Sequence, residues 1–225
     1  MRRTLTTSFA VLCLTSATIA QGQPIEQVRL QADKGDVKAQ IELGLRYFNA
    51  EGVRQDDDQA ERWLQKALAQ DATKAYIALG WFYINADMPK RDRDRGVALY
   101  LLAAERGDIE AMFNLAEQYE LGRGVLKNES HDEAAVRLFR KVADHGDPEA
   151  MNHLALHYEE GSGVPRDHIE AYKWWSIAAA RATATRRKDF TQDRDFMARE
   201  SMTPSQIATA QQLVRGWLAA FAKRQ

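Results

Sequence analysis

Apolar side chains recur at helical spacing between residues 146 and 182, and they predict two helices joined by a short turn. In the first helix, Ala150, Leu154 and Tyr158 follow one another at intervals of four residues and therefore share one face. A Gly-Ser-Gly-Val turn comes next, and Asp167 occupies the position of an N-cap before a second apolar stripe. We therefore expect this segment to form a helical hairpin.

The hairpin pattern occurs four times, with steps of 36, 36 and 39 residues. We place the repeats at 35–70, 71–106, 107–145 and 146–181. The first helices are expected near 37–49, 73–85, 109–121 and 148–160, and the second helices near 57–69, 93–106, 132–144 and 168–181. Each second helix is expected to start at an Asp or Asn, namely Asp56, Asp92, Asn128 and Asp167. Small residues after each Leu mark places where two helices must approach closely, namely Gly44, Gly80, Ala116 and Ala155. A helical period in the thirties predicts an all-α fold, an α-solenoid.

The motif A-x-x-G-D-x-x-A-x-x-x-L-G-x-x-Y, followed by G-x-G-V and D-x-x-x-A-x-x-W, resembles the Sel1-like repeat, a relative of the tetratricopeptide repeat. Repeats one and four match the motif closely, whereas repeat two departs from it at Asp71-Ala72 and Met88-Pro89. The resemblance implies a right-handed α-solenoid that binds other proteins and carries no enzymatic activity.

Both ends of the repeat array are expected to be capped, because a terminal hairpin otherwise exposes its apolar face. Residues 21–34 predict a lone N-terminal capping helix, and residues 183–225 form a C-terminal capping region. In that region the repeat pattern decays to a degenerate helix around Phe190. A clear helix start then follows at Thr203, with Pro204 at the first helical position.

Residues 1–20 predict a secretory signal peptide, with two arginines at the start, an apolar stretch over residues 5–14, and a small-x-small cleavage motif ending at Ala20. An uncleaved anchor is the alternative. A lipoprotein signal is disfavoured because it needs a small residue before its cysteine, whereas Cys13 follows Leu12. We expect cleavage, no membrane insertion afterwards, and a periplasmic protein. The mature chain would then contain no cysteine, unlike secreted relatives that the resemblance associates with a disulfide in each repeat.

The composition is that of an ordinary soluble protein, with 45% hydrophobic and 28% charged residues in a chain of 225. Removing two arginines and no acid with the signal peptide takes the net charge from −1 to −3. A weakly acidic chain is not expected to bind nucleic acid or an anionic membrane.

Candidate chemistry is sparse. Glu149, His153 and His157 stand four residues apart and could share a zinc ion, but we expect this helix face to be solvated and predict neither a metal site nor a cofactor. A hydrolase acting on the cell wall or on β-lactams would need a fixed carboxylate pair, for which Glu117 with Glu120 and Glu159 with Glu160 are the candidates. Both pairs are expected on an open helical surface.

The resemblance places a partner-binding face on the first helices, because tetratricopeptide-like solenoids line their inner surface with them. Transferring the positions gives Lys38, Ile41, Leu45, Phe48, Asn49, Lys74, Ile77, Trp81, Ile84, Asn85, Phe113, Glu117, Glu120 and Glu159. The first half of this set is apolar and aromatic with two lysines, and the second half is acidic. An apolar patch with a polar rim is typical of a protein-binding surface.

We therefore expect a non-enzymatic periplasmic scaffold or regulator that binds a protein or peptide partner along its first helices and is itself a monomer. One alternative is an immunity or inhibitor protein that neutralises a secreted toxin, whose basic surface would suit the acidic half. The cell-wall or β-lactam hydrolase is a second alternative. A structural module that self-associates through the helix at 204–222 is a third.

Overall fold

The computed structural model describes residues 23–87, 90–124 and 130–224. Within these ranges it contains eleven α-helices and no β-strand, which confirms the predicted all-α solenoid. The helices are α1 (Ile25–Asp33), α2 (Val37–Asn49), α3 (Asp57–Leu68), α4 (Thr73–Asn85), α5 (Arg93–Glu105), α6 (Ile109–Glu120), α7 (His131–Asp144), α8 (Pro148–Glu160), α9 (His168–Arg181), α10 (Ala184–Ser201) and α11 (Pro204–Ala222). No helix in the described part of the chain is both long and apolar enough to cross a membrane. The predicted signal peptide lies outside the described residues.

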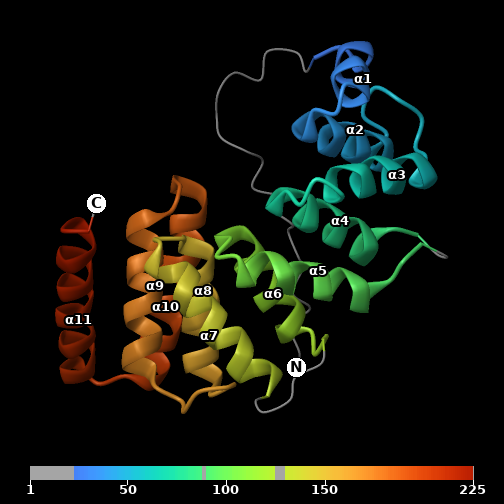
Figure 1. Cartoon of the computed structure of the whole chain (residues 1–225). Coiled ribbons are helices and arrows are strands. Elements are labelled where there is room, and N and C mark those ends of the chain that lie inside the picture. Colours follow the sequence, from blue (N-terminus) through green and yellow to red (C-terminus); the bar gives the residue numbers. More distant parts are fainter. Residues whose placement is uncertain (1–22, 88–89, 125–129, 225) are drawn as a thin grey trace.

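From α1 at one end of the molecule to α10, each helix packs against the next one along the chain, and α11 closes the other end (Figure 1). Within the repeats, α2 pairs with α3, α4 with α5, α6 with α7, and α8 with α9. The eight repeat helices begin and end within one residue of the predicted positions. At the C-terminal end, α10 and α11 both pack against α9.

Aspartate side chains start most of the repeat helices. Each accepts a hydrogen bond from the backbone N–H of a residue in the first helical turn, an arrangement that stabilises a helix by about 0.5–2 kcal/mol. The aspartates are Asp36, Asp56, Asp92, Asp108, Asp147 and Asp167. The predicted cap of α7 was wrong, since Ser130 is its N-cap and forms a capping box with Glu133. Asn128, the predicted start, lies outside the described residues, in the repeat with the longest loop.

The second correction concerns the C-terminal region, where the fading pattern predicts only a degenerate helix. The structure has a complete helix there, α10, of 18 residues. It is anchored by Phe190 and Met197, which are buried against the end of the repeat array, while Phe196 remains 56% exposed. Two buried side chains seven residues apart are enough to dock a helix but too few to give a clear amphipathic pattern.

Two glycines allow α4 and α5 to approach closely, as the small-residue pattern predicts. A Cβ atom on Gly80 would lie 3.0 Å from the carbonyl oxygen of Gly96, and one on Gly96 would lie 2.7 Å from the carbonyl oxygen of Gly80. The side chain of Ile84 fills the space beside Gly96, where its Cγ1 would be 2.6 Å from an added Cβ. The repeat therefore has no room for a larger residue at either glycine.

The Gly-Ser-Gly-Val turn between α8 and α9 contacts the start of α7. Gly161 has φ +80° and ends α8, and Gly163 has φ +70°. A Cβ atom on Gly163 would lie 2.5 Å from the carbonyl oxygen of Asp132 and 2.6 Å from the nitrogen of Glu133. The second glycine is thus required both by its backbone conformation and by the backbone of the preceding repeat.

In repeats one and four the tyrosine of the repeat motif connects its repeat to the helix before it. Arg29 of α1 donates a hydrogen bond of 2.8 Å to the hydroxyl of Tyr47, and Arg140 of α7 donates to the hydroxyl of Tyr158. Both pairs are 18 residues apart, which reflects the regular stacking of the repeats. The tyrosine at the third helical turn therefore joins neighbouring repeats through its polar end.

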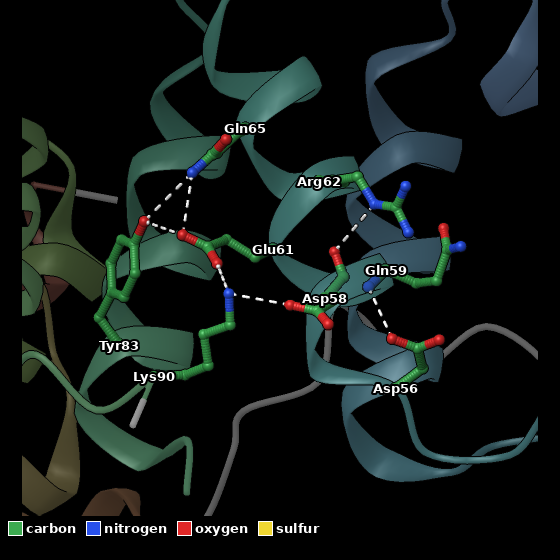
Figure 2. Close-up of polar contacts among 8 residues, drawn as sticks. All are labelled: Asp56, Asp58, Gln59, Glu61, Arg62, Gln65, Tyr83 and Lys90. Atoms are coloured by element: carbon green, nitrogen blue, oxygen red, sulfur yellow. Dashed lines mark hydrogen bonds and ion pairs between the residues drawn. The ribbon is translucent and has the colours of Figure 1, made fainter. Parts of the chain in front are cut away.

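In repeat two the same tyrosine belongs to a larger network, shown in Figure 2. The Tyr83 hydroxyl donates to Glu61 over 2.7 Å and accepts from Gln65 over 3.3 Å. Lys90, in the connection between α4 and α5, bridges Glu61 at 2.8 Å and Asp58 at 2.9 Å. The connection that departs most from the repeat motif is therefore held to α3 by its lysine.

Candidate functional site

The first helices α2, α4, α6 and α8 follow one another along the solenoid, and we call their shared exposed side the first-helix face. Equivalent positions in the four repeats form a row along this face: Leu45, Trp81, Glu117 and Leu156. All four side chains are half-buried. The row is apolar except at Glu117.

An aromatic pair lies where α2 meets α4, and we call Phe48 and Trp81 the aromatic platform. Their ring centroids are 4.8 Å apart and the rings are nearly perpendicular, at 82°. Phe48 also contacts Phe82 of the core at 5.6 Å. Both platform residues are half-buried, and Ile41 and Leu45 pack against the same core cluster as Phe48. The platform is a rigid apolar surface of the kind that anchors a protein partner.

Two of the predicted contact residues, Ile77 and Ile84, are not available to a partner. Their exposed fractions are 5% and 6%, and both belong to the main core cluster. The physical reason is that α4 is apolar on most of its circumference and is covered on several sides. Two motif positions that are predicted to contact a partner in each first helix therefore lie in the core in α4.

Both predicted asparagines and one of the two predicted lysines form polar contacts within the protein. Asn85 donates to the carbonyl oxygen of Trp81 over 2.8 Å, and Asn49 donates to Glu51 over 3.0 Å. Lys38 is exposed. Lys74 forms ion pairs with Glu110 at 2.6 Å and with Asp108, so it joins repeats two and three.

The zinc candidate is replaced by two separate interactions. Glu149 pairs with Arg186 of α10 over 2.7 Å, whereas His153 and His157 both contact the same oxygen of Glu120 in α6, at 3.0 and 2.9 Å. The expectation of a solvated face was wrong, because His157 is only 5% exposed. Within the described ranges, no group of three or more His, Cys, Asp or Glu side chains is arranged to hold a metal ion.

Aromatic packing encloses this histidine pair. The ring of His153 stacks on Phe139 of α7 with centroids 4.4 Å apart, and Phe113 of α6, itself half-buried, contacts the same imidazole edge-on at 5.7 Å. The Nδ1 atom of His157 lies 2.9 Å from the carbonyl oxygen of Ser162. Since a carbonyl can only accept, this nitrogen must carry a proton, which leaves Nε2 to face the carboxylate of Glu120.

The charges of this cluster follow from the geometry. Burial alone would raise the pKa of the Glu120 carboxyl, but the hydrogen bonds from His153 and His157 outweigh it and lower that pKa to about 2. Burial opposes the charge of His157, but the hydrogen bond and charge of Glu120 raise its pKa. Glu120 is therefore an ion-paired acceptor and is poorly suited to donate a proton as a catalytic acid.

Two other carboxylates of the predicted set, Glu117 and Glu159, have a raised pKa, whereas that of Glu120 is lowered. Burial, with the nearby charges of Glu120 and Glu149, outweighs His153 and raises the pKa of the Glu117 carboxyl. Burial and the neighbouring Glu160 likewise raise the pKa of Glu159. Both groups are acidic side chains in surroundings that disfavour their charge.

Two open depressions lie away from the first-helix face. One of about 360 Å³ runs along α7 beside Val164, and one of about 640 Å³ lies between α9, α10 and α11. The second is lined by residues that include Tyr172, Met202 and Ile207. Sequence reasoning could not find it, because it depends on how α10 folds back on α9.

The family model described as Sel1 repeat matches residues 37–71, 73–108, 109–147 and 148–182. The protective antigen of uropathogenic Escherichia coli strains, which displays an SLR fold, is 27% identical with a TM-score of 0.72, over 89% of this chain and 41% of that one. A Sel1 repeat protein from Oxalobacter formigenes is 26% identical with a TM-score of 0.64, over 89% of this chain and 78% of that one.

The similarity to a curated protein is more limited. The ERAD-associated E3 ubiquitin-protein ligase component HRD3B of Arabidopsis thaliana is 28% identical over 113 residues, which are 49% of this chain. The match spans 18% of the length of HRD3B. This chain therefore matches only a small part of a much longer protein.

Proposed function

The chain belongs to the Sel1 repeat family, and from this premise we propose that it is a non-enzymatic, protein-binding scaffold or regulator. Its partner binds along the first-helix face. The observation that carries the proposal is the aromatic platform, where Phe48 and Trp81 keep apolar surface at the boundary of two repeats. Aromatic side chains on a rigid framework supply much of the binding energy in protein interfaces. Solenoids offer such extended surfaces without an enclosed pocket.

The platform is tested by capture of partners from an envelope extract with residues 21–225 and with the Phe48→Ala, Trp81→Ala double variant. We expect the variant to bind a captured partner at least about 30-fold more weakly, because central aromatic residues contribute about 2 kcal/mol or more. The measurement is the dissociation constant for the purified partner, with helicity of the variant checked by circular dichroism.

A matched control is available on α5, where Leu101 and Leu102 are 39% and 45% exposed. The Leu101→Ala, Leu102→Ala variant also removes two apolar side chains, but from a second helix. Its affinity should equal that of the unchanged chain. Equal loss in both double variants, or in neither, would count against the first-helix face as the binding surface.

We also propose that the protein is exported to the periplasm and acts there as a monomer. Support comes from the pattern of residues 1–20. After expression of the full chain in a Gram-negative host, the periplasmic fraction should contain a product that begins at Gln21, as measured by intact mass. A product that begins at Met1 and stays with the membrane fraction would instead identify an uncleaved anchor.

A further inference from the structure

Resting on the proposed function, we propose that the partner is an extended peptide segment with two anchors. One is an apolar side chain on the aromatic platform, and the other is a lysine or arginine that binds the carboxylate of Glu117. The first-helix face thereby selects a partner segment that carries both an apolar and a basic residue.

The two anchor sites are neighbours in the row of equivalent positions. Trp81 of α4 and Glu117 of α6 are 36 residues apart, one repeat length, so they occupy the same place on adjacent first helices. Lys74 of α4 forms ion pairs with Glu110 and Asp108 at the start of α6, so the two helices are joined at their N-terminal ends. A chain that crosses the first helices therefore meets Trp81 and Glu117 in succession.

Glu117 differs from the other carboxylates of α6 and α8 that lie near it. Glu110 is paired with Lys74, Glu120 with two histidines, and Glu149 with Arg186. Among the residues that the structure describes, no hydrogen bond or ion pair holds the Glu117 side chain. The charge facing it from α8 is His153, whose Nδ1 is already bound to Glu120.

A half-buried carboxylate without a cation is unfavourable, because burial removes water without supplying a substitute. The raised pKa of Glu117 reflects this cost and the repulsion from Glu120 and Glu149. A guanidinium or ammonium group at this point would remove both disadvantages at once. The same substitution of charge gives no benefit at Glu110 or Glu149, which already have partners.

The experiment presents a random-peptide library on phage to residues 21–225, to a Glu117→Gln variant and to the Phe48→Ala, Trp81→Ala variant. We expect the unchanged chain to enrich peptides that contain both an aromatic or aliphatic residue and a Lys or Arg. The Glu117→Gln variant should still enrich the apolar residue but lose the preference for the basic one. The platform variant should enrich neither.

A charge exchange gives the sharpest measurement on one selected synthetic peptide. Replacing its basic residue by Glu, or Glu117 by Lys, should each weaken binding about tenfold or more, and combining the two changes should restore most of the affinity. The matched control is Glu105→Lys on α5, an exposed glutamate of a second helix, which should leave the affinity unchanged.

The outcomes separate the two proposals. Enrichment of apolar residues without a basic preference, or no rescue in the charge exchange, overturns the role of Glu117 and leaves the proposed function standing. Enrichment that survives loss of the platform, or none at all, overturns the proposed function and this inference together. A dimer in sedimentation that dissociates in the platform variant would show that a second copy occupies the face, which also overturns a peptide partner.

Discussion

Gly163→Ala is expected to destabilise the protein by about 3 kcal/mol, the sum of about 1–2 kcal/mol for a left-handed alanine and about 1–3 kcal/mol for a steric clash. Its φ of +70° disfavours any side chain, and an added Cβ would overlap the backbone of Asp132 and Glu133. The obstacle is backbone at the start of α7, which cannot rotate away as a side chain could. In thermal unfolding this corresponds to a midpoint lower by about 6–12 °C.

Gly161→Ala in the same turn is the matched control. Its φ is +80°, but the nearest atoms to an added Cβ are those of Arg166 at 3.3 Å, which need to move by only a few tenths of an ångström. It should cost only the backbone conformation, about 1–2 kcal/mol. If the two variants unfold at the same temperature, the turn does not depend on close contact with the preceding repeat.

Glu120→Gln is expected to lower the stability by about 2–3 kcal/mol at pH 5.5, because it removes the partly buried carboxylate that His153 and His157 share. It should also change the pH dependence of the unfolding temperature. The unchanged chain should be most stable between about pH 4.5 and 6.5 as far as this cluster is concerned. The variant should have a flatter profile.

The direction in which stability changes with pH follows from the pKa shifts of Glu120 and His157. The pKa of Glu120 is lowered from 4.5 to about 2 by folding, so its contribution is present above pH 4.5 and is lost as the pH falls through that range. The pKa of His157 is raised above 6.5, so its contribution is present below pH 6.5 and is lost as the pH rises through the raised value. Asp132 of α7 acts in the same direction on His157.

The control for this prediction is Glu105→Gln, the same chemical change at an exposed position of α5. Its unfolding temperature should follow that of the unchanged chain at every pH. A Glu120→Gln profile parallel to that of the unchanged chain would show that the cluster does not titrate with folding.

Most of the fold could be predicted because each repeat carries its own start and stop signals. A capping aspartate such as Asp56 or Asp167 fixes where a second helix begins, and the glycine turn fixes where a first helix ends. The N-cap of α7 was not predicted although Ser130 and Glu133 form a recognisable capping box, because the repeat spacing indicated Asn128 instead. This helix therefore begins at its capping box and not at the position that the repeat spacing indicates.

The candidate site was predicted less well, because its properties depend on contacts between repeats. The four-residue spacing of His153 and His157 was visible, but their partner Glu120 lies in another helix, 33 and 37 residues away. Similarly, the apolar residue Ile84 gives no sign in the sequence that it fills the space beside Gly96. The row that contains Trp81 and Glu117, by contrast, follows directly from the repeat period.

The tyrosine contacts between repeats have a consequence for how such chains change in length over evolution. Arg29 with Tyr47 and Arg140 with Tyr158 each join a repeat only to the helix before it, at the same separation of 18 residues. Duplication or loss of one unit of the gene would therefore carry half of such a contact at each junction and restore it with the neighbouring unit. The protein could therefore gain or lose whole repeats without a new kind of contact between them. Each added repeat would add one position to the row on the first-helix face.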